Sequence, residues 1–133
     1  MSGVLIIRAL LSANTAVLAQ VAADKIMAGV IPINTVLPAI SIAQISGVTR
    51  NTIGMNEAKV MVTDRVQITV MTKNYASQKS ILDLVRAACP NTNGLVNGVQ
   101  CDSIWGDTTG PDIFDSEFTI YFQSVDFMVR YLR

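Results

Sequence analysis

The sequence predicts an α+β fold, and three observations lead to this prediction. Apolar residues near the chain start recur with the spacing of short helices, residues 60–71 alternate as a half-buried strand does, and residues 76–89 return to helical spacing. At 133 residues the chain has the length of one domain, residues 1–133. A domain of this size buries roughly two thirds of the surface of its unfolded chain. We therefore expect a core that needs no disulfide.

The first part of the chain predicts two short helices. Residues 3–11 are apolar on nearly every side except at Arg8, which is typical of a helix that contacts neighbours on several faces. Asn14 is a suitable N-cap for a second helix over residues 15–23. Residues 27–37 contain a glycine and a proline among Val and Ile residues, so we expect a short extended piece followed by a loop.

The first full strand is predicted over residues 39–46, which are rich in Ile and small residues, and we expect Gly47 to end it. Residues 48–58 are polar and contain Asn and Gly, yet they include Ile53 and Met55. Two interpretations of this segment remain open. It is either a loose hairpin tip or an arm that reaches a neighbouring subunit.

The second strand is predicted over residues 60–71, where two parities alternate. The apolar parity should face the core, and its members are Val60, Val62, Val66, Ile68 and Val70. The other parity should be exposed to solvent or form an interface, and its members are Met61, Thr63, Arg65, Gln67, Thr69 and Met71. Asp64 interrupts the apolar parity, which predicts a β-bulge or a position near the sheet edge.

A central helix is predicted over residues 76–89, because apolar residues recur there at spacings of three and four. This stripe consists of Ile81, Leu82, Val85, Ala88 and Cys89. Lys79 and Asp83 are expected to pair on the outward side, and Pro90 is expected to stop the helix. The stripe should pack on the apolar parity of the second strand.

Two more strands are predicted in the C-terminal part. Residues 99–105 alternate, with Val99, Cys101, Ser103 and Trp105 on one face. Residues 106–116 read as a turn-rich loop. The last strand covers residues 117–131 and changes apolar parity near Gln123 and Ser124, which predicts a bulge or a sharp coil there. Trp105 is either an aromatic residue of the sheet core or the anchor of an interface.

Composition favours association with other proteins. Hydrophobic residues make up 50% of the chain and charged residues only 15%, against about 25% in ordinary domains. Too few charges remain to cover a monomer, so we expect self-association. The net charge is zero, and no cluster of Lys and Arg of the kind that nucleic-acid binding requires is present. The sequence offers no apolar run long enough for a membrane span, and its first residues do not fit a signal peptide.

Acidic residues gather between positions 102 and 126, and the four that matter most are Asp107, Asp112, Asp115 and Glu117. They are either a solvated loop whose Asp residues cap turns or a surface that repels DNA or steers a basic partner. The chain has no histidine, which excludes imidazole-based nucleophile activation and metal binding. Cys89 and Cys101 are expected to be small buried thiols. We therefore predict no catalytic residues, no metal and no cofactor.

The order of these segments resembles a known family. The segments that carry the resemblance are IIRALLSANTAV, LPAISIAQISG, DRVQITVMTKNYASQKSILDLVRAAC and SVDFMVRYLR. Together they span essentially the whole chain, and they are similar to the tail completion proteins of long-tailed bacteriophages. This family includes tail terminators and tail-to-head joining proteins. The shared features are patterns of alternation and not invariant chemical residues.

The resemblance implies a mostly antiparallel sheet of four strands or slightly more, flanked by N-terminal helices and one long central helix. It also implies a homohexameric ring in the virion, at the head-tail junction, that assembles in the host cytoplasm. Such a ring caps the tail tube, ends its polymerisation and docks to the head connector, while DNA passes through its lumen without sequence-specific binding. The alternative is a head-side neck or connector ring.

Residue roles follow from the resemblance only as expectations. Ile53, Met55, Met61 and Met71 are the candidate contacts with a neighbouring subunit or with the tail tube. The acidic residues Asp107, Asp112, Asp115 and Glu117 are the candidate lining of the lumen or of a nearby loop. No enzymatic activity and no membrane association are expected.

Overall fold

The computed structural model describes residues 2–32, 35–50 and 60–132. Its helices are α1 (Ser2–Ala13), α2 (Thr15–Gln20), the 3-10 turn η1 (Ala23–Lys25) and α3 (Tyr75–Ala88). Its strands are β1 (Ile26–Ala28), β2 (Ala39–Arg50), β3 (Met61–Thr72), β4 (Gly94–Val96), β5 (Val99–Thr109), β6 (Ile113–Asp115) and β7 (Ile120–Leu132). The α+β class is confirmed.

The sheet is larger than predicted and it is mixed. The described residues form one seven-stranded sheet in the order β1-β2-β3-β7-β5-β4, with β6 on β7. β1 runs parallel to β2, and the other pairs are antiparallel. The four predicted strands correspond to β2, β3, β5 and β7, but β1, β4 and β6 have only three residues each. Such short strands leave too little alternation for a sequence pattern to reveal.

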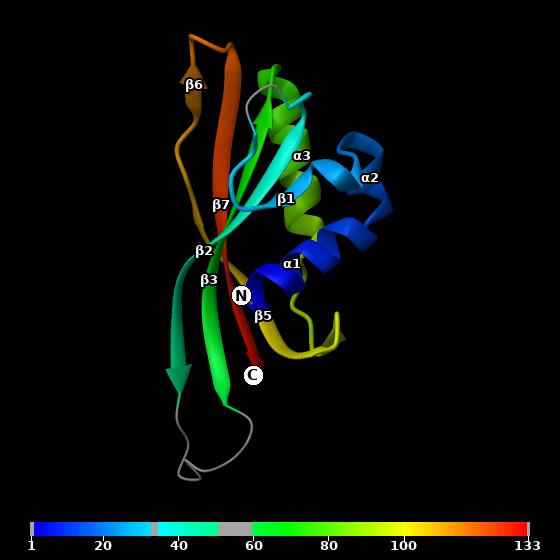
Figure 1. The fold of residues 1–133 in the computed structure, drawn as a ribbon, viewed down its shortest axis with the longest axis vertical. Helices are drawn as coiled ribbons and strands as arrows, with labels where there is room; N and C mark the ends of the chain where they lie inside the picture. Colours follow the sequence, from blue (N-terminus) through cyan, green and yellow to red (C-terminus); the bar gives the residue numbers. More distant parts are fainter. Residues whose placement is uncertain (1, 33–34, 51–59, 133) are drawn as a thin grey trace.

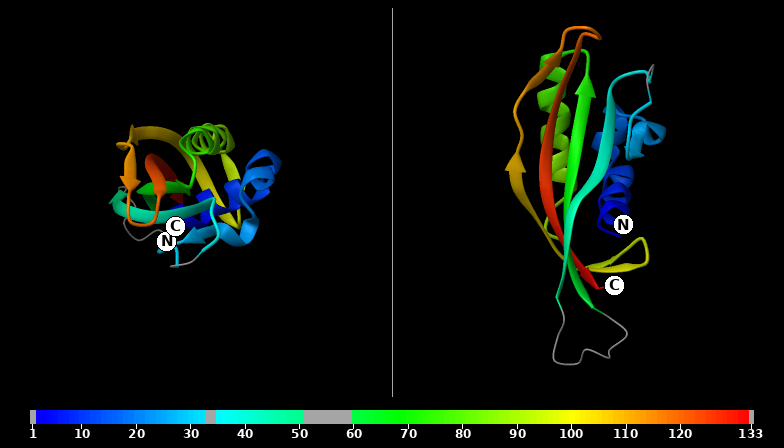
Figure 2. Two further views of the ribbon diagram at one scale, coloured as in Figure 1. Left: turned by 90° about the horizontal axis from the view of Figure 1, so that it is seen from above. Right: turned by 60° about the vertical axis from the view of Figure 1, so that its left-hand side comes forward.

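Helices cover one face of the sheet (Figure 1). α1 and α3 both pack against β3 and β7, and α2 packs between α1 and α3. The core consists of their apolar stripes and of alternate strand residues, including Ile6, Ile7, Leu11, Ile42, Val66, Ile68, Ile81, Leu82, Val85, Val125, Phe127 and Val129. The views in Figure 2 show the strands twisting past one another along the long axis of the molecule. The predicted packing of the α3 stripe on β3 is confirmed.

Local capping explains where the helices begin. The Val17 N–H donates 3.1 Å to Asn14 Oδ1, so Asn14 caps α2 as predicted. α2 ends at Gln20, short of the predicted residue 23, because Val21 has an extended backbone and the chain then tightens into η1. Asn74 caps α3 through the Ala76 N–H at 2.9 Å. α3 has 14 residues and α1 has 12, so the prediction of one distinctly long central helix is wrong.

β2 continues through Gly47 to Arg50, so the prediction that Gly47 ends the strand is wrong. The glycine is required for a close approach within the sheet. A Cβ atom built on Gly47 would lie 2.6 Å from Oδ1 of Asp64 on β3. Glycine is therefore required here because no space is left for a Cβ atom, and not because the chain turns at this position.

Asp64 lies in the interior of the sheet, so the prediction of a bulge or an edge position there is wrong. β3 runs between β2 and β7, and Asp64 is 1% exposed on the face that the helices cover. The register shift of this region falls on β2, between Gln44 and Ser46. The Asp64 carboxylate occupies a core position because two donors, Gly3 N–H and the Tyr131 hydroxyl, bind it there.

Two predictions about parity also fail. A register shift between Cys101 and Ser103 places Cys101 and Ile104 in the core, so the predicted four-residue face of β5 is not continuous. β7 pairs with β3 without any shift, so the predicted bulge at Gln123 and Ser124 is absent from this pair. Ile120 lines a pocket with residues of the β1–β2 connection. An apolar residue at this end of β7 is thus covered by that loop, which accounts for the change of parity.

Candidate assembly surface

No helix of the described residues packs on one face of the sheet, and we call this face the open face. It is formed by the residues of β3 and β7 that alternate with the core residues. From β3 these are Met61, Thr63, Arg65, Gln67, Thr69 and Met71, and from β7 they are Phe122, Ser124, Asp126, Met128, Arg130 and Leu132. Most of these side chains are half-buried by their own neighbours. The open face is therefore polar in its middle and apolar toward both ends.

Charges on the open face neutralise one another. The Arg65 guanidinium lies 3.0 Å from the Asp126 carboxylate and also forms an ion pair with Asp107 of β5. The hydrogen bond to Asp126 is the main reason that the pKa of Arg65 lies above its ordinary value. Arg130 lies over the Trp105 ring, 5.5 Å from its centroid. The two basic and two acidic side chains in this region, Arg65, Arg130, Asp107 and Asp126, therefore give the middle of the open face no net charge.

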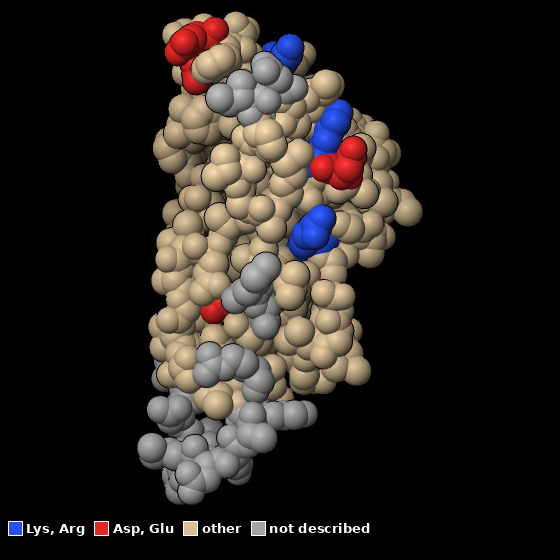
Figure 3. Space-filling model, viewed as in Figure 1, with Lys and Arg blue, Asp and Glu red and all other residues tan. Residues whose placement is uncertain are grey.

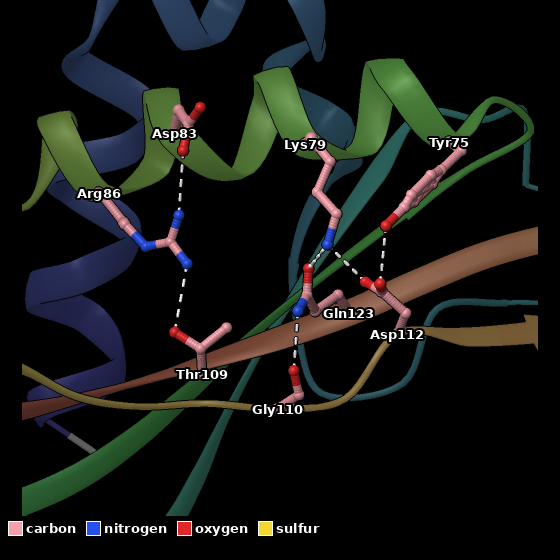
Figure 4. A network of polar contacts seen from close by, with 8 residues as sticks. All are labelled: Tyr75, Lys79, Asp83, Arg86, Thr109, Gly110, Asp112 and Gln123. Carbon is pink, nitrogen blue, oxygen red and sulfur yellow. Dashed lines mark hydrogen bonds and ion pairs between the residues drawn. The ribbon is translucent and has the colours of Figure 1, made fainter.

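A second polar site links α3 to the segment between β5 and β7, and we call it the α3 network (Figure 4). Its members are Tyr75, Lys79, Asp112 and Gln123. Lys79 forms an ion pair with Asp112 and donates 2.6 Å to Gln123 Oε1. The Tyr75 hydroxyl donates 2.7 Å to Asp112, and Gln123 Nε2 donates 2.8 Å to the Gly110 carbonyl. One turn of α3 therefore fixes the chain where β5 ends and β6 begins.

The electrostatics of the α3 network suit a structural contact. The hydrogen bond from Lys79 lowers the pKa of Asp112, with a smaller effect from Tyr75. The hydrogen bond to Asp112 raises the pKa of Lys79. An amine that acts as a nucleophile or base needs a lowered pKa, so the environment of Lys79 favours a permanent cation.

A second contact lies further along α3. Arg86 forms an ion pair of 3.0 Å with Asp83, and its other nitrogen donates 3.2 Å to Thr109 Oγ1. The predicted outward pair of Lys79 and Asp83 is therefore wrong, since each side chain has another partner. Asp83 pairs within α3 with Arg86, while Lys79 pairs with Asp112 in the segment between β5 and β6.

The predicted acidic residues do not lie in one solvated loop, because β5 extends to Thr109 and β6 covers residues 113–115. Asp107 pairs with Arg65, and Asp112 belongs to the α3 network. The Asp115 carboxylate accepts the Glu117 N–H at 3.0 Å and so caps the turn before β7. The Glu117 side chain is exposed and forms no ion pair with the described residues. Their predicted role as a lining of a lumen stays a prediction.

The predicted contact residues fall into two groups. Ile53 and Met55 lie outside the described residues. Met61 and Met71 lie on the open face at opposite ends of β3, where they pair with Leu132 and Phe122 of β7. Met71 also lines the pocket beneath the β1–β2 connection. Whether they contact another subunit stays a prediction.

Trp105 is on the open-face side of β5, beside Met128 of β7, and is 40% exposed. The interpretation of Trp105 as an aromatic residue of the core is therefore wrong. The register shift before Ser103 separates Trp105 from Cys101, and that shift depends on pairing that local alternation does not reveal. An exposed, half-packed Trp is available for contact with another chain.

The described residues contain no cluster of three or more His, Cys, Asp or Glu side chains that could hold a metal ion. Burial raises the pKa of the Cys89 thiol to about 12, so this sulfur is protonated at neutral pH and is a poor nucleophile. Burial also raises the pKa of Cys101, and both cysteines are unpaired. Within the described part of the chain, no helix is long and apolar enough to cross a membrane.

Sequence reasoning missed the α3 network and the site around Asp64. Both depend on contacts between distant segments: Lys79 and Gln123 lie 44 positions apart, and Asp64 and Tyr131 lie 67 apart. One signal was present for Asp64, since an acidic residue within an apolar parity requires a buried donor if the strand is regular. No comparable signal marked Asp112.

Comparisons relate this chain to known proteins. The family model described as "Tail completion protein gp17" matches residues 6–131. A solved chain from a structure titled "Virion of native gene transfer agent (GTA) particle" has a similar fold, with a TM-score of 0.77 and 13% sequence identity. The match covers 99% of this chain and 97% of that chain. No curated protein matches the sequence.

Proposed function

Since the chain belongs to the family of tail completion protein gp17, we propose that it closes the head-proximal end of a phage tail tube as a structural protein of the virion. In this proposal six copies form a ring that caps the tube, ends its polymerisation and joins the tail to the head connector. DNA passes through the ring without sequence-specific binding. The family match over residues 6–131 carries the proposal.

The surface of the chain supports an assembly role. Large apolar side chains are exposed at several places on the described surface: Val30, Val36, Ile45, Val48, Leu95, Trp105, Ile113, Phe114 and Phe118 are each at least 40% exposed. Ile113 and Phe114 are neighbours on β6, and contiguous exposed apolar groups mark contact surfaces. The similar fold of a chain in a gene transfer agent virion fits a location in the virion.

We also propose that the protein is not an enzyme. The sequence has no histidine, the Cys89 thiol is buried with a pKa of about 12, and Lys79 is held as a cation by Asp112. Burial of this thiol and pairing of this amine both suppress their reactivity, which supports the proposal.

We propose that the surface of the lumen repels DNA or has no attraction for it. Of the four candidate acids, Asp107 and Asp112 are already neutralised by Arg65 and Lys79. Glu117 is exposed and forms no ion pair with the described side chains. If the turn before β7 lines the lumen, changing Glu117 to Lys should slow DNA ejection and leave ring assembly unchanged. An ejection rate that does not change would place this turn away from the lumen.

Deletion of the gene from the phage genome tests the proposal. Without a terminator, tubes should polymerise past their normal length and remain unattached to heads, as seen by electron microscopy of the lysate. The gene supplied in trans should restore tails of normal length. Free tails of normal length beside filled heads would instead support the head-side alternative, and infectious particles of normal form would contradict both.

A further inference from the structure

The two outermost long strands of the sheet are paired along only part of their outer sides. β1 covers β2 at residues 40–42, and β4 covers β5 at residues 99–101. In the described ranges, no strand pairs with the outer side of β2 after Ile42 or of β5 after Cys101. Asn91 accepts the Ile104 N–H at 3.1 Å, so the open part of β5 begins at Trp105. We call residues 43–50 the β2 edge and residues 105–109 the β5 edge.

Both edges lack Lys and Pro, which are two of the residues that protect natural edge strands from pairing. Each edge does contain a register shift, between Gln44 and Ser46 in β2 and between Gly106 and Thr109 in β5. Val48 is 56% exposed on the β2 edge. Figure 3 shows the side of the molecule on which β2 lies in front, and charged side chains are few on the left-hand part of this surface. Asp107, the acid of the β5 edge, is paired with Arg65.

The two edges overlap in their level along the sheet. Strand pairing connects residues across all four long strands, from β2 through β3 and β7 to β5. Two such rows join the edges: Ser46, Arg65, Met128 and Trp105 form one, and Gln44, Val66, Phe127 and Gly106 form the other. The row of Val48, Thr63 and Arg130 leads to Ser103, just before the β5 edge. A second copy placed beside the first without a large shift along the strands would therefore bring a β2 edge next to a β5 edge.

The strand directions also fit. β2 is antiparallel to β3, β3 to β7, and β7 to β5, so β2 and β5 run in opposite directions. β2 and β5 lie on opposite sides of the central strands (Figure 2). Copies in the same orientation would thus meet in an antiparallel junction, and the alternation of directions would continue from one copy to the next.

There is room beside the β5 edge for an incoming strand. A groove of about 320 Å³ runs between this edge and the end of α3, with Cys89, Ile104, Val125 and Phe127 among its lining residues. Gly106 adds no side chain to it, and the nearest atom to a Cβ built there is Phe127 Cε1 at 3.9 Å. The groove can accept the side chains that a paired strand would direct toward the helices.

We propose that the β2 edge of one copy pairs with the β5 edge of the next copy, so that a continuous antiparallel sheet runs around the assembly. The occupant of each edge is a second copy of this chain, because one chain supplies both halves of the junction at overlapping levels and in matching directions. The contact is head-to-tail, the type that closes into rings. This inference rests on the proposed function and identifies the subunit interface of its ring.

Trp105 and Val48 should lie diagonally across this junction, because Trp105 is level with Ser46 and Val48 is two positions further along β2. An aromatic side chain reaches such a diagonal neighbour. Both lie on the open-face side of their strands, since Trp105 pairs with Met128 and Val48 pairs with Thr63. An aromatic residue beside a β-branched residue across two strands is a favourable pair. Burial of these two exposed side chains gives the junction an apolar centre.

Two charge substitutions test the junction separately on each side. Val48→Lys blocks every β2 edge and leaves the β5 edge intact, and Trp105→Lys does the reverse. We expect native mass spectrometry to show an oligomer for the unchanged chain and a monomer for each variant. An equimolar mixture should form a dimer that contains one copy of each variant, because only one kind of junction survives. Thr108→Lys blocks the same edge if Trp105→Lys does not fold.

Val30→Lys is the matched control, because Val30 is 90% exposed and lies outside both edges; its assembly should be unchanged. An oligomer that persists in both edge variants would overturn the junction and leave the ring proposal intact. Monomeric variants that form no mixed dimer would also overturn the junction. A monomeric unchanged chain would overturn the ring and the junction together, while the deletion result would still test the role in tail closure.

Discussion

The hydroxyl of Tyr131, near the end of β7, donates a hydrogen bond of 2.9 Å to Oδ2 of Asp64 in β3. The same carboxylate accepts the Gly3 N–H of α1 at 3.3 Å. Asp64 therefore joins two central strands to the first turn of α1, where a negative group also interacts favourably with the helix dipole. Because Asp64 is 1% exposed, water cannot replace either donor.

Tyr131→Phe should lower the free energy of unfolding by about 1–3 kcal/mol, because it removes one donor from a buried carboxylate. Denaturant unfolding followed by circular dichroism measures this change. Tyr121→Phe is the matched control, since the Tyr121 hydroxyl has no hydrogen bond among the contacts of the described residues. Equal stability of the two variants would mean that the Tyr131 bond contributes nothing.

Gly47→Ala should also destabilise the fold, by about 1–3 kcal/mol, which is typical of overpacking. The added methyl group would lie 2.6 Å from Asp64 Oδ1 and 3.0 Å from Gln44 Nε2. The Asp64 carboxylate cannot move away without breaking its hydrogen bonds to Gly3 and Tyr131. Gly106→Ala is the control, because its Cβ would meet Phe127 at an ordinary 3.9 Å, and we expect a change within about 0.5 kcal/mol. A Gly47→Ala variant with an unchanged free energy of unfolding would show that the Asp64 side chain can adopt another conformation.

Gln78→Met should raise the free energy of unfolding by about 1–2 kcal/mol, because replacing an unpartnered buried amide by an apolar side chain of similar size removes the cost of desolvation. Gln78 is 1% exposed on α3, and neither its Nε2 nor its Oε1 has a partner among the described atoms. Gln123→Met should have the opposite effect, since that amide binds Lys79 and Gly110. Chemical denaturation of both variants measures the two changes. Loss of stability in Gln78→Met would indicate that the amide has a partner such as a buried water.

The α3 network should stabilise the fold over a defined range of pH. Because the folded-state pKa of Asp112 lies below the ordinary 3.8, its contribution is complete above that value and is lost as pH falls through the folded pKa. Because the pKa of Lys79 lies above the ordinary 10.5, its contribution is lost as pH rises through the folded pKa. The Tm difference between the unchanged chain and Asp112→Asn should therefore be constant around neutral pH and disappear in acid.

The matched control for this measurement is Glu117→Gln, because Glu117 is exposed and has no ion pair among the described side chains. We expect it to show no comparable Tm difference at neutral pH. A Tm difference for Asp112→Asn that persists unchanged at low pH would contradict an ionic origin, because the protonated carboxyl group and the amide that replaces it would then differ for another reason.

Local patterns predicted the parts of the fold that depend on local spacing. The α3 stripe of Ile81, Leu82 and Val85 is buried as expected, because a helix repeats its face within one segment. The Asn14 cap is also correct, since it requires only a few consecutive residues. The same holds for the alternation of β3, where Val62, Val66, Ile68 and Val70 are in the core, while Val60 lies before the strand and is half-buried.

The features that the sequence did not reveal depend on partners from distant segments. The sequence indicated that Asp64 interrupts the apolar parity of the strand, because its donors, Gly3 and Tyr131, lie 61 and 67 positions away. Trp105 was assigned to the wrong face because one register shift at Ser103 reverses every later side chain of a strand. The acids of the predicted loop were separated by ion pairs to Arg65 and Lys79, which no spacing within the loop indicates.

Electron cryomicroscopy of the head-tail junction of the phage tests the central claim most directly. The account predicts a ring of copies of this chain at the head-proximal end of the tail tube, with β2 of each copy beside β5 of the next. A junction from which the chain is absent, or a ring of it on the head side of the connector, would contradict the proposal that it closes the tail tube.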